Sequence, residues 1–80
     1  MSTIKVKFIN NNPYDVTIKW GDAPDREPNA SRNLGANKSD DLNITQGKHV
    51  FADKYPSAKR GTYLGEATTN NQTFNIPNVK

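Results

Sequence analysis

The chain has 80 residues, with 11 lysines and arginines, 8 aspartates and glutamates, one histidine, no cysteine and 32% hydrophobic residues. These numbers describe one small domain spanning residues 1–80, and they exclude disulfide frameworks, thiol nucleophiles and zinc-thiolate sites. No apolar run approaches the ~20 residues that span a bilayer, and the first residues lack the uninterrupted apolar stretch that is typical of a signal peptide. We therefore expect no membrane span and a cytoplasmic protein, unless a leader has been removed. The net charge of +3 is spread along the chain, so no specific nucleic-acid partner is expected.

Two runs of alternating apolar and polar residues open the chain, over residues 3–9 and 14–20, and each has the period of two that is typical of a half-buried strand. The inward positions are Ile4, Val6 and Phe8 in the first run and Val16, Ile18 and Trp20 in the second. The Asn and Pro residues at 10–13 predict a turn between the runs. We therefore expect an antiparallel hairpin, with Lys5, Lys7 and Lys19 on one outward face.

The next segment is polar. Residues 21–33 contain two prolines, which predicts a loop or an irregular edge segment. Leu34 follows as an isolated core residue, and residues 35–41 are rich in turn-forming side chains.

The second half of the chain contains four more short strands. Residues 42–45 and 49–52 flank a Gly-containing turn at 46–48, so a second hairpin is expected there. Short strands are also predicted at 62–64 and 73–76, and no segment has the 3.6-residue period of a helix. The pattern predicts an all-β fold, a small antiparallel β-sandwich of about seven short strands, immunoglobulin- or prealbumin-like.

Catalysis is hard to build from these residues. His49 is the only histidine and has no cysteine to activate; because it alternates with Val50, we expect an outward, partly exposed ring. Asp40 and Asp41 form the obvious carboxylate pair, but adjacent residues of a strand point apart. These two with Asn37 and Asp53 could offer oxygen ligands to calcium, without the spacing of an EF-hand. We therefore expect no enzyme, cofactor or metal site.

Several aromatic rings are candidates for a stacking surface, since proline and sugar rings both bind to aromatic faces. They are Tyr14, Trp20, Phe51, Tyr55 and Tyr63. Trp20 ends a strand with inward Val16 and Ile18, which favours core packing for its ring.

A series of landmarks runs through most of the chain in a fixed order. They are residues 6–10, Pro13, Val16, Trp20, Leu34, Gly47, His49, Phe51, Gly61, Leu64, Phe74 and Ile76-Pro77. This order resembles the β-domain of the von Hippel-Lindau tumour suppressor. The resemblance implies a module that docks an extended hydroxyproline-containing peptide, with Trp20, Thr45, His49 and Phe51 at matching positions.

The chain departs from that family in two respects. Ser31 and Arg32 occupy the region where the family has a tyrosine, and Phe51 stands where a second tryptophan is expected. The helical domain that recruits ubiquitin-ligase adaptors has no counterpart, so the resemblance does not imply a ligase-receptor role. We expect a non-enzymatic module that binds an extended, proline-containing peptide of a partner protein. The alternatives are a lectin-like domain that binds glycans through Tyr and Asn, and a structural protein that self-associates; the sequence does not indicate the oligomeric state.

Overall fold

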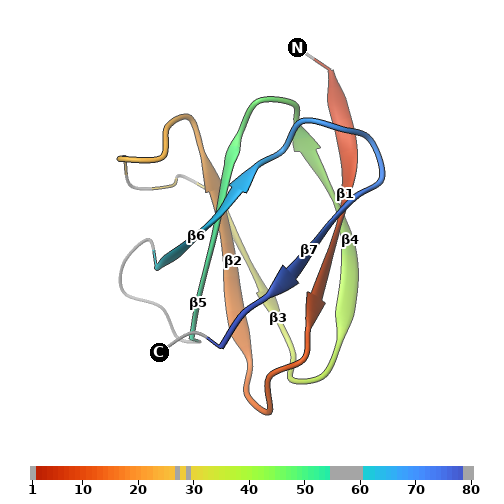
Figure 1. Cartoon of the computed structure of the whole chain (residues 1–80), viewed down its shortest axis with the longest axis vertical. Helices are drawn as coiled ribbons and strands as arrows, with labels where there is room; N and C mark the ends of the chain where they lie inside the picture. The colour runs from red at the N-terminus through yellow and green to blue at the C-terminus, as the bar shows by residue number, and fades with distance from the viewer. Residues whose placement is uncertain (1, 27, 29, 55–60, 79–80) are drawn as a thin grey trace.

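The computed structural model describes residues 2–26, 28, 30–54 and 61–78, which form two β-sheets packed face to face (Figure 1). The strands are β1 (Thr3–Asn10), β2 (Val16–Gly21), β3 (Ala30–Leu34), β4 (Ser39–Thr45), β5 (His49–Lys54), β6 (Thr62–Glu66) and β7 (Gln72–Ile76). One sheet has the order β4-β1-β7 and the other the order β3-β2-β5-β6. The expected all-β sandwich of about seven short strands is confirmed.

Both predicted hairpins are wrong. β1 pairs with β4 and β7, whereas β2 pairs with β3 and β5, so β1 and β2 lie in different sheets, as do β4 and β5. Alternation indicates which face of a strand is buried against the opposite sheet. It does not indicate which strand lies beside it in its own sheet. The connections at 11–15 and 46–48 therefore pass from one sheet to the other.

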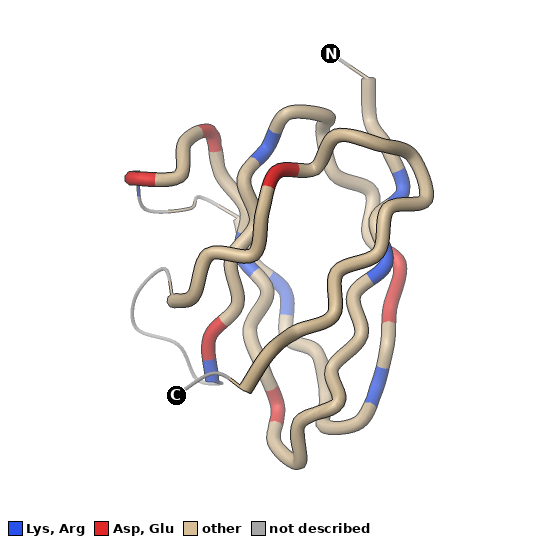
Figure 2. Tube along the Cα trace, viewed as in Figure 1, with Lys and Arg blue, Asp and Glu red and all other residues tan. Residues whose placement is uncertain are grey.

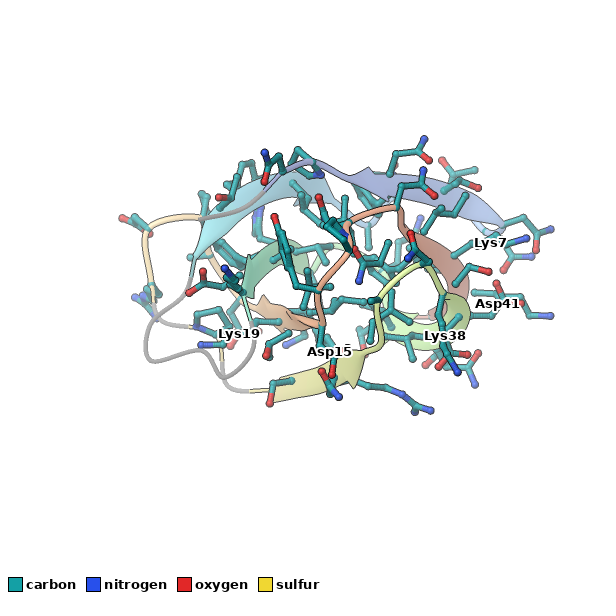
Figure 3. All side chains as sticks on the ribbon, turned by 90° about the horizontal axis from the view of Figure 1, so that it is seen from below. Lys7, Asp15, Lys19, Lys38 and Asp41 are labelled. Atoms are coloured by element: carbon teal, nitrogen blue, oxygen red, sulfur yellow. The ribbon has the colours of Figure 1, made fainter. Side chains whose placement is uncertain are left out.

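The three outward lysines consequently do not share a face. Lys5 and Lys7 project from the outer side of the three-stranded sheet, whereas Lys19 belongs to the outer face of the four-stranded sheet. Figure 3 shows Lys7 and Lys19 on opposite sides of the molecule. Charged residues of both signs are distributed over both sheets (Figure 2).

Two further differences concern the sheet edges. The predicted loop over residues 21–33 contains most of β3, and β4 begins at Ser39, inside the predicted turn. Both are edge strands, where solvent reaches positions that a central strand would bury, so the apolar alternation is incomplete. Leu34, the only buried residue of β3, pairs with Val16 and is a core residue as expected. One pairing also departs from the antiparallel scheme, because β1 and β7 run parallel.

The core fills the space between the sheets. Its buried members are Ile4, Val6, Phe8, Val16, Ile18, Leu34, Leu42, Ile44, Val50, Ala52, Ala67 and Ile76. Phe8 stacks on Phe74 with ring centroids 5.6 Å apart, and Trp20 packs against the same cluster from a half-buried position. The inward positions predicted from alternation in β1 and β2 are therefore confirmed.

A buried asparagine fixes the passage from β1 to β2. Asn10 is 0% exposed, and its Nδ2 donates to the carbonyl oxygens of Tyr14 (3.0 Å), Leu34 (3.3 Å) and Gly35 (3.0 Å). Its Oδ1 accepts hydrogen bonds from the backbone N–H and the Nδ2 of Asn12, both at 3.0 Å. One amide therefore ties the β1–β2 connection to the end of β3 and to the connection that follows it, and satisfies backbone groups of both segments.

Candidate functional site

The first candidate site lies on the outer face of the four-stranded sheet, at edge strand β6. Tyr63 is 46% exposed and is the only large hydrophobic side chain among the described residues that is exposed to this degree. The next residue, Leu64, packs against the core, so alternation turns Tyr63 outward. β6 pairs with β5 on one side only, which leaves its second edge open among the described strands.

Tyr63 contacts two rings of the neighbouring strand. Its hydroxyl lies 2.7 Å from Nδ1 of His49, and its ring meets Phe51 edge-on with centroids 5.3 Å apart. Phe51 is only 1% exposed, although its neighbours Val50 and Ala52 point into the core, so it is buried on the outer face. We call His49, Phe51 and Tyr63 the aromatic cluster.

The four predicted ligand residues are only partly brought together. His49 and Phe51 share the outer face, and alternation with Val50 places His49 outward as expected. Trp20 packs on the inner side of the same sheet, and Thr45 ends β4 of the other sheet. Tyr63, which the sequence offers only as one of several candidate rings, therefore takes the place that Trp20 was expected to fill.

An ion pair stands beside the aromatic cluster. Lys48, which immediately precedes His49, bonds through Nζ to the Asp22 carboxylate, and Gly21 pairs with His49 in the sheet. The hydrogen bond from Lys48 and its positive charge lower the pKa of Asp22, and Arg26 adds a smaller effect of the same sign. Because Asp22 is exposed, the pair orients the turn more than it stabilises the fold.

The other candidate groups have structural partners or lie outside the described residues. Asp40 and Asp41 point apart as expected, since Asp40 pairs with Arg32 at 3.2 Å and Asp41 faces the opposite side of β4. Tyr14 is half-buried, with its hydroxyl 2.6 Å from Asn78 Oδ1 and its ring beneath Lys54, 4.8 Å from the ammonium nitrogen. Tyr55 lies outside the described residues.

A second candidate site lies on the outer face of the three-stranded sheet. It is a hollow of about 250 Å³ lined by Lys5, Lys7, Asp41, Asn71 and Thr73, which we call the polar hollow. The residues come from three strands and a turn, and the parallel pairing of β1 with β7 places Thr73 beside Lys7. No sequence motif links positions more than 60 residues apart, which is why sequence reasoning missed this site.

Comparison with known protein families, with curated proteins and with solved structures finds no match to the chain. Within the described ranges, no helix could cross a membrane, and no three His, Asp or Glu side chains are grouped to hold a metal ion.

Proposed function

We propose that the protein is a non-enzymatic binding module that recognises an extended, proline-containing peptide at the β6 edge and the aromatic cluster. The observation that carries this proposal is the exposed Tyr63 ring on a strand whose second edge no other described strand covers, with Phe51 and His49 in contact with the ring. Rigid, half-exposed aromatic rings are the usual platform for proline, and an open strand edge is the usual platform for an extended backbone.

The two features are complementary. An added strand would pair its backbone with the N–H and C=O groups of β6 that the described strands leave unpaired, except the Glu66 carbonyl oxygen, which accepts a hydrogen bond from Gln72 Nε2. Alternate side chains of the added strand would then face the same side as Tyr63. Proline has no N–H, so it fits an added strand only where its nitrogen points away from β6. In that register the pyrrolidine ring can stack on Tyr63 without the loss of a hydrogen bond.

His49 supplies a polar contact beside the ring. Its Nδ1 is engaged with the Tyr63 hydroxyl, while Nε2 makes no hydrogen bond with the described residues. When Tyr63 donates to Nδ1, the neutral imidazole carries its proton on Nε2 and donates to a peptide carbonyl or a hydroxyl group. The resemblance to the von Hippel-Lindau β-domain supports the same ligand class, with His49 contacting a hydroxylated proline.

The test is a chemical-shift titration of the full chain with a proline-rich peptide and with the same peptide in which the prolines are alanine. We expect shifts at Tyr63, His49 and neighbouring residues of β6 with the first peptide only. Tyr63→Ala removes the stacking surface and should weaken binding about tenfold, whereas Tyr63→Phe keeps the ring and should weaken it about twofold. Asn43→Ala, an exposed change on the other sheet, is the matched control.

Equal shifts with both peptides would refute the preference for proline. Unchanged affinity in a folded Tyr63→Ala protein would refute the site itself. Shifts with neutral glycans in place of peptides would favour the lectin alternative.

A further inference from the structure

The polar hollow lies on the face opposite the aromatic cluster and is therefore a separate site. Lys5 and Lys7 are two residues apart on the central strand β1, so their side chains leave the sheet on the same side. Asp41 of β4 and Thr73 of β7 are the register partners of Lys7 on its two sides. Figure 3 shows Lys7 and Asp41 projecting together from this side of the molecule.

All five lining side chains have unused hydrogen-bonding capacity. None of them forms a side-chain hydrogen bond or an ion pair with another residue of the described segments, although Lys7 and Asp41 are cross-strand neighbours of opposite charge. The polar side chains next to them in sequence are engaged instead. Asp40 pairs with Arg32, and the Asn70 side chain accepts a hydrogen bond from the backbone N–H of Lys5.

The backbone around the hollow is held in place. Asn70 Oδ1 accepts from Lys5 N at 2.9 Å, and Asn71 N donates to Lys5 O at 2.8 Å, so the turn before β7 is tied to β1 from both sides. Gln72 Oε1 accepts from the backbone N–H groups of Thr68 and Thr69 and fixes the turn itself. The lining positions are therefore preorganised, which reduces the ordering cost of binding.

We propose that the polar hollow binds a sugar acid, meaning a single sugar ring that carries one carboxylate and several hydroxyl groups. The two ammonium groups match the carboxylate, and the Asp41 carboxylate, the Thr73 hydroxyl and the Asn71 amide match hydroxyl groups that both donate and accept. The volume of about 250 Å³ is below the ~300 Å³ at which pockets for drug-sized ligands begin, so it suits one small ring.

The same residues argue against two other anionic ligands. A polyphosphate or nucleic-acid backbone would bring repeated negative charge against Asp41, and the lining contains no aromatic ring on which a base could stack. A simple inorganic anion would contact the two lysines, but it has no hydroxyl group to bind to Asp41 of β4 and Thr73 of β7.

The experiment is a chemical-shift titration of the full chain with glucuronate, glucose and inorganic sulfate. We expect glucuronate to shift the amides of Lys5, Lys7, Asn71 and Thr73 and to bind about two- to fivefold more tightly than glucose, the effect of an exposed ion pair. A glucuronate-terminated disaccharide distinguishes the source, since tighter binding of the disaccharide indicates the end of a glycan and equal binding indicates a free sugar acid.

Variants test the two kinds of contact separately. Lys7→Met should weaken glucuronate about two- to fivefold and leave glucose unchanged, whereas Thr73→Val should weaken both sugars. Lys38→Met removes an exposed lysine outside the hollow and is the matched control. Sulfate shifts equal to those of glucuronate would overturn the sugar assignment, and so would equal binding of glucose and glucuronate. Absence of shifts would overturn the site without bearing on the peptide surface.

Discussion

Replacing Asn10 by alanine should remove most of the stability of the fold. The side chain is fully buried, and it contacts three carbonyl oxygens and two N–H groups within 3.3 Å. Alanine leaves these backbone and side-chain groups without their partner, at three hydrogen bonds that are buried and two that are partly buried.

The magnitude follows from the number of bonds. The amide has two protons to share among three carbonyl oxygens, and its oxygen accepts two further bonds, so about four full hydrogen bonds are lost. At about 0.5–1.5 kcal/mol each, the loss is about 2–6 kcal/mol. A single core of this size supplies roughly 3–5 kcal/mol, so Asn10→Ala should be largely unfolded at 25 °C.

The assay is denaturant unfolding followed by Trp20 fluorescence, with a stabilising osmolyte added equally to every sample so that the variant retains a folded baseline. Asn11→Ala is the matched control, because Asn11 is exposed in the same turn and its loss should change the free energy of unfolding by less than about 0.5 kcal/mol. A loss below about 1 kcal/mol for Asn10→Ala would refute the reasoning, since the buried groups would then have found other partners.

Three further changes test other parts of the sandwich. Thr17→Val should stabilise the fold by about 1–3 kcal/mol in the same unfolding assay, because Thr17 Oγ1 is buried without a hydrogen-bond partner among the described residues, and Thr17→Ser should not stabilise it. Gly61→Ala should cost about 2 kcal/mol or more, because φ is +80° and a Cβ would lie 2.5 Å from Ala52 O; Gly35→Ala, which meets only the flexible Lys38 side chain, should be nearly neutral. Lys48→Met should raise the pKa of Asp22 toward its ordinary value, measured by NMR titration of the carboxyl carbon. A carboxyl group whose pKa is lowered in the folded state stabilises the fold at pH values above its ordinary pKa, and this stabilisation is lost as the pH falls through the lowered pKa. The free energies of unfolding of wild type and variant should therefore converge at acid pH. A difference in stability that persists at acid pH would exclude this ion pair as the cause of the difference.

The facing of residues could be predicted from the sequence, but the pairing of strands could not. Alternation correctly assigns Val6, Phe8, Ile18 and Val50 to the interior, because a strand with one buried face must repeat every two residues. The same pattern is produced whether the next strand lies beside it or across the sandwich. The short connections at 46–48 and 11–15 therefore suggested hairpins, although each of them joins a strand of one sheet to a strand of the other.

The burial of Asn10 is a second feature that could not be predicted from the sequence. In the sequence it belongs to a run of three asparagines before Pro13, which is typical of an exposed turn. The structure exposes Asn11 and buries Asn10 and Asn12, whose Nδ2 reaches Pro77 O at 3.0 Å near the other end of the chain. Asn10 is separated from its partners Leu34 and Gly35 by up to 25 residues, and Asn12 from Pro77 by 65, so composition identifies the turn but not which of its amides is buried.

The candidate sites also depend on both the facing of residues and the pairing of strands. His49 could be placed outward from the sequence because it alternates with Val50, whereas the sequence offers Tyr63 only as one of several candidate rings. The resemblance implies that Trp20 lies beside His49, whereas alternation favours core packing of its ring, which the structure confirms; the pairing of β5 with β6 is what brings Tyr63 beside His49. The proposed peptide surface thus depends on one pairing and the polar hollow on another, the parallel pairing of β1 with β7. Because the two surfaces lie on opposite outer faces, occupation of one leaves the other open, and a ligand of one should not compete with a ligand of the other.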